Sequence, residues 1–343
     1  MPQRLPSEQH EGQARRTVFV LGGGGSLGAY QAGAIVGLAE GGLVPDALFG
    51  CSAGALNAAF LAVGPSLGRA HELAAWWISS PARSVLSPGL WTRLRGLAAV
   101  ATTRSDGLLD GRPLRRMVTE HVRAHDLSEL AVPLTVTTTC LDCGTERHHD
   151  RGPVGDLLLA SCALPGLFPP VPLADGHRHV DGGVVCGVPV QAALDTAGPR
   201  DTIVVIDCAL APVTGRSGAC AALPMNDLAA QEEACGLPTR SLGRVYVAPV
   251  ESSRGALDVV LKAFTVARAA ANRASTAAAL ADPRVHVVPH VADAWAAGLL
   301  DELPAGPRDF ALTAALVESG RAAAYSWLAG ARHTAMPAAG NTT

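Results

Sequence analysis

A short apolar run that ends directly in four glycines is the feature that most restricts the fold of this chain. The run TVFVL covers Thr17–Leu21, and Gly22–Gly25 follow it at once. β-Branched residues bounded by glycine are typical of a buried strand that enters a loop. The next stretch, Ala29–Glu40, has helical composition and ends at a glycine pair, a common helix stop. This region therefore predicts a strand, a glycine loop and a helix in immediate succession.

The same order of strand, turn and helix recurs along the chain. Asp46–Phe49 is a second short strand, followed by a Gly-x-Ser-x-Gly turn and the helical stretch Ala55–Val63. Further strands are expected at Leu134–Cys140, Arg178–Val180, Thr202–Asp207, Arg244–Val250 and Val285–Val288. Further helices are expected at Arg69–Ile78, Pro113–Arg123, Val154–Ala163, Gln191–Ala197, Leu257–Ala281 and Asp309–Leu328. Strands that alternate with helices favour an α/β fold of three layers, with a mostly parallel central sheet covered on both faces.

Composition excludes several classes of protein. The 343 residues are 48% hydrophobic and 17% charged with a net charge of −3, which fits a globular chain and gives no reason to expect nucleic acid as a partner. Eight cysteines are too few for a disulfide scaffold and favour a reducing compartment. Residues 1–16 lack the apolar core of a secretion signal. We therefore expect a cytoplasmic protein.

Two uncharged windows are long enough to span a bilayer. They cover Thr17–Ala39 and Ala47–Gly68, and glycines interrupt both of them. Because the glycines fall where strand-to-helix turns are expected, the windows are predicted to be buried segments of the α/β core. Contact with membranes is then expected to be peripheral.

The Gly-x-Ser-x-Gly turn is the first candidate for chemistry. Gly50, Cys51, Ser52, Ala53 and Gly54 stand between a predicted strand and a predicted helix, which is the context of a nucleophile elbow. The flanking glycines allow a tight turn, and the helix N-terminus favours developing negative charge. Taken alone, the pattern fits a helix-capping serine equally well.

The glycine loop strengthens the catalytic interpretation. The loop Gly22–Gly28 opens the first helix, so its backbone N–H groups can converge on an anion such as the oxyanion of acyl transfer. The same stretch also satisfies the dinucleotide-binding pattern G-x-G-x-x-G. That pattern requires an acidic residue after the second strand, whereas Asp46 stands before it. Nucleotide binding is therefore the weaker alternative.

A third motif supplies a candidate base. Asp181 ends a predicted strand and is followed by Gly182 and Gly183, so a glycine turn could hold its carboxylate toward Ser52. A carboxylate with an ordinary pKa of about 4 is a poor base for serine. We therefore expect Asp181 to be desolvated, which would raise its pKa. An aspartate in an ordinary Asx turn is the alternative for this motif taken alone.

Other reactive side chains are assigned no role. Cys140 and Cys143 have redox or zinc spacing but no second C-x-x-C partner, so a buried thiol is expected at Cys140. His177 and His179 precede Asp181 too closely to bridge it to Ser52. His148 and its neighbour His149 are expected in a solvated turn. Cys51 is expected to be a packing residue.

Taken together, the motifs resemble the patatin-like phospholipase family, whose bacterial members hydrolyse acyl lipids with a Ser–Asp dyad. The resemblance rests on GGGGSLGAYQAG, GCSAGALNA, ASCALPGLFPPV and HVDGGVVCGVPV, and more loosely on the terminal GRAAAYSWL. It implies a patatin-like domain over residues 17–329, with a motif-bearing core over 17–208 and a C-terminal completion over 209–329. Residues 1–16 and 330–343 are expected to be tails.

The resemblance also implies roles for individual residues. Ser52 matches the nucleophile and Asp181 the general base. The oxyanion loop matches Gly23, Gly24, Gly25, Ser26, Leu27 and Gly28. The family usually has Arg or Lys at the position of Leu27, and asparagine where Cys186 or Gly187 stands here.

This comparison implies an acyl hydrolase that acts on lipid or other acyl esters through an acyl-enzyme, at a transient membrane surface and without a metal ion or cofactor. A catalytically silent lipid-binding or regulatory protein is the alternative, because the two departures could reflect lost activity.

Overall fold

The computed structural model describes residues 15–79, 106–107, 109–208, 267–268, 270–272, 274–291, 294 and 310–335. Within these ranges the strands are β1 (Thr17–Leu21), β2 (Ala47–Cys51), β3 (Leu134–Cys140), β4 (Glu146–His149), β5 (Val171–Pro172), β6 (Arg178–Asp181), β7 (Thr202–Ile206) and β8 (Val285–Val287). The helices are α1 (Gly28–Glu40), α2 (Ala53–Ala62), α3 (Leu67–Ile78), α6 (Arg112–Val122), α7 (Val154–Ser161), α8 (Val190–Thr196) and α14 (Thr313–Ala335), and the 3₁₀ turns are η2 (Gly25–Leu27), η3 (Leu127–Glu129) and η4 (Gly182–Val184).

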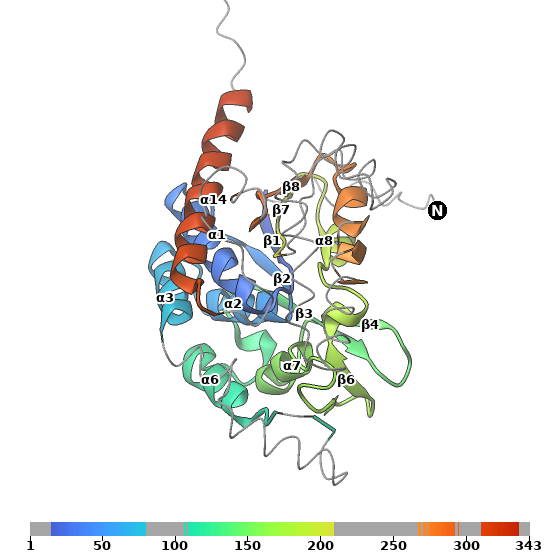
Figure 1. Ribbon diagram of the computed structural model, residues 1–343. Coiled ribbons are helices and arrows are strands. Elements are labelled where there is room, and N and C mark those ends of the chain that lie inside the picture. Colours follow the sequence, from blue (N-terminus) through green and yellow to red (C-terminus); the bar gives the residue numbers. More distant parts are fainter. Residues whose placement is uncertain are drawn as a thin grey trace, which may run out of the picture.

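The strands form one sheet in the order β5-β6-β3-β2-β1-β7-β8, and β4 pairs with β3 outside this sequence of neighbours (Figure 1). The pairs from β3 through β2, β1 and β7 to β8 are parallel. The pairs that involve β4, β5 and β6 are antiparallel. The prediction of a mostly parallel sheet is confirmed, and the antiparallel part lies at the end of the sheet that carries Asp181.

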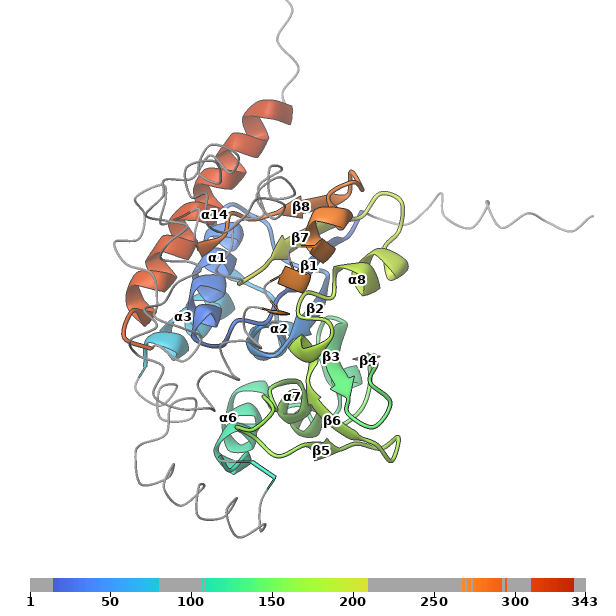
Figure 2. The ribbon, with the colours of Figure 1, turned by 45° about the vertical axis from the view of Figure 1, so that its right-hand side comes forward.

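Helices cover both faces of the sheet. Alternate side chains of β1 enter different cores: Phe19 and Leu21 pack with α1, α2, α3 and α14, whereas Val18 and Val20 pack with α8. Figures 1 and 2 show α1, α3 and α14 together on one side and α8 on the other. The uninterrupted apolar sequence of β1 is explained by this burial on both faces.

The first uncharged window is buried in the core, as predicted, and the second is buried as far as Ala62, whereas residues 63–68 at its end are exposed or half-buried. The first forms β1, the glycine loop and most of α1, and the second forms β2 and α2. Among the described helices, none has both the length and the apolar character that crossing a bilayer requires.

Some predicted boundaries differ from the structure. Arg16, the last residue of the predicted N-terminal tail, forms an ion pair of 2.7 Å with Asp201 beside β7. The last helix begins at Thr313 and continues to Ala335, past the predicted end at Leu328. Strands β4 and β5 were not predicted, because their short sequences carry no apolar alternation. The strand predicted at Arg244–Val250 lies outside the described residues.

Helices α1 and α14 lie side by side and approach closely at glycines (Figure 1). A Cβ atom added to Gly33 would collide with the backbone carbonyl of Val317, and one added to Gly320 would collide with that of Tyr30. The two backbones therefore touch where a side chain would separate them.

Gly33→Ala is accordingly expected to lower the free energy of unfolding by about 1–3 kcal/mol, because overpacking costs more than the gain in helix propensity. Denaturant unfolding of the purified protein measures this change. Gly68→Ala in α3 is the matched control, since a Cβ there meets no atom within 4 Å. Equal stabilities of the two variants would show that α1 and α14 can separate without cost.

Candidate functional site

The Gly-x-Ser-x-Gly turn forms a tight elbow between β2 and α2. Ser52 occupies it with φ 54° and ψ −124°, a conformation that favours glycine. A Cβ on Gly54 would collide with the carbonyl oxygens of Leu21 and Gly22, and one on Gly50 would lie 2.6 Å from the Cα of Ala55. Both glycines are therefore needed for the close approach of the elbow to its neighbours. The strained serine indicates a site in which position matters more than local stability.

Ser52 and Asp181 meet at the ends of strands that are not neighbours. The register pairs Cys51 of β2 with Thr137 of β3, and Thr138 of β3 with Asp181 of β6. The Ser52 hydroxyl donates a hydrogen bond of 2.6 Å to Oδ2 of Asp181 across this arrangement. Ser52 is 8% exposed and Asp181 1% exposed. The sheet thus brings the two predicted residues together in a nearly dry environment.

Further hydrogen bonds fix both groups. The backbone N–H of Ser52 donates to Oγ of Ser161 at 2.9 Å, and that hydroxyl donates to the carbonyl of Thr137 at 2.7 Å. The N–H of Gly183 donates to Oδ1 of Asp181 at 2.8 Å, as expected for a glycine turn that holds the carboxylate. Ser161 was not singled out from the sequence, although it belongs to the motif ASCALPGLFPPV.

Burial raises the pKa of the Asp181 carboxyl, as predicted. The positive charge of Arg268 and hydrogen bonds from Ser52 and Gly183 oppose this effect without cancelling it. Burial also raises the pKa of the Cys51 and Cys162 thiols well above the usual value, and the Asp181 charge adds to the rise. Cys51 is therefore a neutral packing residue, as expected.

Two backbone donors of the glycine loop have no partner among the described residues. The N–H groups of Gly22 and Gly23 donate to the carbonyls of Ile206 and Gly187, at 3.1 and 2.9 Å. In the part of the chain that the structure describes, no acceptor is recorded for the N–H groups of Gly24 and Gly25. Gly25 has φ +60°, which turns the backbone sharply before α1.

The rest of the loop packs inward. A Cβ on Gly23 would lie 3.2 Å from the Cβ of Ser52, so the loop covers the nucleophile candidate. Ser26 and Leu27 are buried, Gly28 starts α1, and the Leu27 side chain belongs to the apolar core. The N–H of Gly23 is engaged with Gly187, so it is a poorer oxyanion donor than the sequence suggested.

A helical segment far along the chain also reaches this site. Residues 267–268, 270–272 and 274–279 are helical, and we call this segment the Arg268 helix. It packs through Ala279 against the same core as α8, and both views show its orange ribbon on the side of α8 (Figures 1 and 2). Arg268 reaches toward Gly23 and Gly183, and the Asn272 carboxamide lies against Gly187. No local motif marks these two residues in the sequence.

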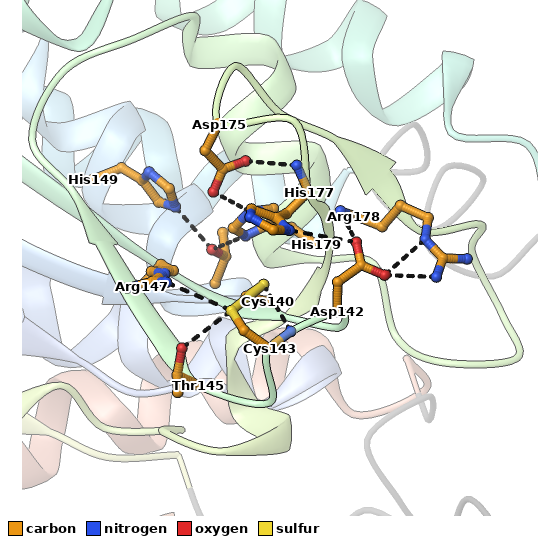
Figure 3. Close-up of a disulfide and its surroundings, with 11 residues drawn as sticks. Cys140, Asp142, Cys143, Thr145, Arg147, His149, Asp175, His177, Arg178 and His179 are labelled. Atoms are coloured by element: carbon orange, nitrogen blue, oxygen red, sulfur yellow. Dashed lines mark hydrogen bonds and ion pairs between the residues drawn. A yellow bond between two sulfur atoms is a disulfide. The ribbon is translucent and has the colours of Figure 1, made fainter.

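The histidines near Asp181 are engaged elsewhere. The buried ring of His179 bonds through Nδ1 to Thr138 Oγ1 at 2.8 Å and through Nε2 to Asp175 at 2.9 Å (Figure 3). His149 bonds to the same threonine hydroxyl, also at 2.8 Å. The prediction that no histidine bridges Asp181 to Ser52 agrees with these contacts. The solvated turn predicted for His148-His149 is wrong, because both residues belong to β4.

Cys140 and Cys143 form a disulfide (Figure 3), so the prediction of a buried thiol at Cys140 is wrong. Cys140 ends β3, and the following turn brings the two Cα atoms to 5.6 Å, within the usual range for a disulfide. Within the described ranges, no three His, Cys, Asp or Glu side chains gather as they would around a metal ion.

A mostly parallel sheet covered on both faces, an elbow serine and a buried aspartate bonded to it define a class of α/β protein with a Ser–Asp site. The family model described as "Patatin-like phospholipase" matches residues 19–194, which span most of β1, the elbow, Asp181 and most of α8. The chain belongs to this family.

Several proteins with different names are similar in sequence to about half of this chain. The chain is 27% identical over 176 residues to mouse patatin-like phospholipase domain-containing protein 7, covering 51% of this chain and 12% of that protein. It is 32% identical over 189 residues to mouse 1-acylglycerol-3-phosphate O-acyltransferase Pnpla3, covering 53% and 43%. It is 30% identical over 177 residues to an NTE family protein of Mycobacterium tuberculosis, covering 51% and 44%. The match thus spans less than half the length of each of these relatives.

Proposed function

We propose that this protein is a lipid acyl hydrolase, a carboxylic ester hydrolase in which Ser52 is the nucleophile and Asp181 the general base. The observation that carries the proposal is the 2.6 Å hydrogen bond from the Ser52 hydroxyl to the buried Asp181 carboxylate. A serine is activated when a base within hydrogen-bond reach takes its proton. The family and the names of its relatives support a lipid substrate.

The proposed reaction has two steps. Ser52 Oγ attacks the ester carbonyl carbon while its proton passes to Asp181, and the carbonyl oxygen becomes an oxyanion. The N–H groups of Gly24 and Gly25 have no acceptor among the described residues, so these two loop donors are available to stabilise that charge. Collapse of this intermediate releases the alcohol, which takes the proton from Asp181, and leaves an acyl-serine. Water, deprotonated by the same carboxylate, then hydrolyses the acyl-serine and restores Ser52.

Two exposed valines that follow the Asp181 turn support contact with a lipid surface. Val184 and Val185 follow the Asp181 turn directly and are 40% and 43% exposed. Apolar side chains at this position would meet acyl chains when the substrate enters from a membrane or micelle. The protein is proposed to associate peripherally with such surfaces.

Dinucleotide binding has less support. Asp46 directly precedes β2 and accepts a hydrogen bond of 2.7 Å from the backbone N–H of Thr17, the first residue of β1. The glycine loop follows the other end of β1. Asp46 is therefore far from the glycine loop along β1 and β2. A ribose would need the acidic side chain at the loop end.

Labelling with a fluorophosphonate tests the proposal. Intact mass is expected to show one adduct on the wild-type protein, and peptide mapping is expected to place it on Ser52. The same preparation is expected to release fatty acid from phosphatidylcholine vesicles or micelles. A folded wild-type protein without an adduct would favour the silent lipid-binding alternative.

A further inference from the structure

The glycine loop contains no charged side chain, although it adjoins the proposed reaction centre. Its seven residues are glycines apart from Ser26 and Leu27, and the Leu27 side chain is buried in the apolar core. Any positive charge that assists the oxyanion must therefore come from another part of the chain. Arg268, in the Arg268 helix, lies beside the glycine loop.

The Arg268 guanidinium lies between the glycine loop and the Asp181 turn. A Cβ on Gly23 would be 3.6 Å from Nη1 of Arg268 and 3.2 Å from the Cβ of Ser52. A Cβ on Gly183 would be 3.3 Å from the same Nη1 and 2.9 Å from Oδ1 of Asp181. One nitrogen is thus close to the loop that covers the nucleophile and to the turn that holds the base.

The charge of Arg268 acts on groups from three strands of the sheet. It lowers the pKa of Asp181 at the end of β6, of Cys51 at the end of β2 and of Cys208 after β7. In all three groups, burial raises the pKa more than Arg268 lowers it. The guanidinium therefore lies over the carboxyl ends of the central strands, where ligands bind in open α/β sheets.

Asn272, one helical turn after Arg268, fixes the helix against the same loops. It is 2% exposed, and a Cβ on Gly187 would collide with its carboxamide. The carbonyl of Gly187 accepts the N–H of Gly23, so this contact connects the Arg268 helix to the glycine loop. Nδ2 of Asn272 has no hydrogen-bond partner among the described residues.

We propose that Arg268 is a catalytic residue that supplies positive charge to the developing oxyanion, and that Asn272 is a positioning residue that sets the Arg268 helix against Gly187. The proposal rests on the proposed acyl hydrolase function. During attack, negative charge leaves the Asp181 carboxylate as it takes the Ser52 proton, and appears on the carbonyl oxygen. Arg268 adjoins both places, so it keeps Asp181 ionised before attack and stabilises the oxyanion afterwards.

Arg268→Met removes the charge at nearly constant length, and Arg268→Lys keeps it. The expected result with a soluble neutral ester such as p-nitrophenyl butyrate is a fall in kcat of about 10- to 100-fold for Arg268→Met, with KM changed less than twofold and partial retention of kcat in Arg268→Lys. Arg116→Met, at an exposed arginine of α6, is the control for the loss of one charge. Arg268→Gln replaces the Met variant if thermal unfolding shows that variant to be destabilised.

The pH profile separates a catalytic role from a structural one. Among the described residues, the ionisable groups that interact with the Asp181 charge are the Arg268 guanidinium and the Cys51 and Cys162 thiols. The thiols stay neutral in acid and an arginine keeps its charge there, so the acid limb of kcat/KM reports Asp181. Loss of the Arg268 charge is expected to move this limb to higher pH. Asn272→Ala is expected to move it in the same direction by a smaller amount, with unchanged secondary structure by circular dichroism.

The outcomes distinguish the two proposals. An active wild-type protein whose Arg268→Met variant keeps its kcat and its acid limb would overturn the role of Arg268 while leaving the acyl hydrolase proposal intact. A wild-type protein that neither takes up fluorophosphonate nor hydrolyses esters would overturn both. A loss of kcat equal in Arg268→Met and Arg116→Met would show only a general effect of net charge, and would likewise refute the assignment.

Discussion

Replacing Ser52 by alanine is expected to lower kcat/KM for ester hydrolysis by about 10⁴-fold or more, because the acyl-enzyme can no longer form. The hydroxyl is the group that donates to Asp181 at 2.6 Å, and the loop that covers it offers no alternative nucleophile except the buried Ser26. The measurement is the initial rate of p-nitrophenyl butyrate hydrolysis, with fluorophosphonate labelling followed by intact mass. Labelling that persists in the variant would place the nucleophile on another serine.

Ser52→Gly provides a second comparison at the same position. Because φ is 54° at Ser52, glycine relieves strain there that alanine retains. Ser52→Gly is therefore expected to be more stable to denaturant than Ser52→Ala by about 1–2 kcal/mol, although both are inactive. Equal stabilities would indicate that the elbow is relaxed, and that its geometry is not maintained at the expense of stability.

Asp181→Asn is expected to lower kcat/KM by about 10³- to 10⁴-fold, comparable to the loss of a triad carboxylate elsewhere. The amide has nearly the same shape and its oxygen can still accept the N–H of Gly183, but it cannot take the Ser52 proton. Fluorophosphonate labelling of Ser52 is expected to slow by a similar factor. Asp150→Asn, an exposed carboxylate paired with Arg151, is the matched control and is expected to label at the wild-type rate.

The pH profiles of the wild-type protein and of Asp181→Asn test the pKa of Asp181. The base acts in its ionised form, so activity is present above its pKa and is lost as pH falls through it. Burial raises this pKa, and the acid limb of the wild-type profile is expected at a pH above the ordinary carboxyl value of 3.8. The residual activity of Asp181→Asn is expected to lack this limb. A wild-type limb at or below 3.8 would contradict a desolvated base.

Local sequence predicted the parts of the site that depend on a few adjacent residues. Glycines on both sides of Ser52 imply a tight turn wherever a strand meets a helix, and Asp181 before two glycines implies a carboxylate held by backbone N–H groups. The structure has both local geometries. The mostly parallel sheet follows in the same way from the alternation of apolar runs with helical stretches.

Contacts between distant segments were not predictable to the same degree. Arg268 and Asn272 carry no motif, and the roles proposed for them depend on the contacts of the Arg268 helix with Gly23, Gly183 and Gly187. The engagement of the Gly23 N–H with Gly187 is also a tertiary contact, and because of it the proposed oxyanion donors are Gly24 and Gly25. At Cys140, the path of the turn after β3 decided between a free thiol and a disulfide with Cys143.

The elbow at Ser52, the glycine loop and the turn after Asp181 follow from local sequence, because backbone sterics act within a few residues. The contact between Ser52 and Asp181, which are 129 residues apart in the chain, instead depends on the tertiary arrangement in which β3 lies between β2 and β6. The tertiary structure also places the Arg268 charge beside them. Strand order and helix docking follow from the packing of both faces of the sheet, which no short segment encodes.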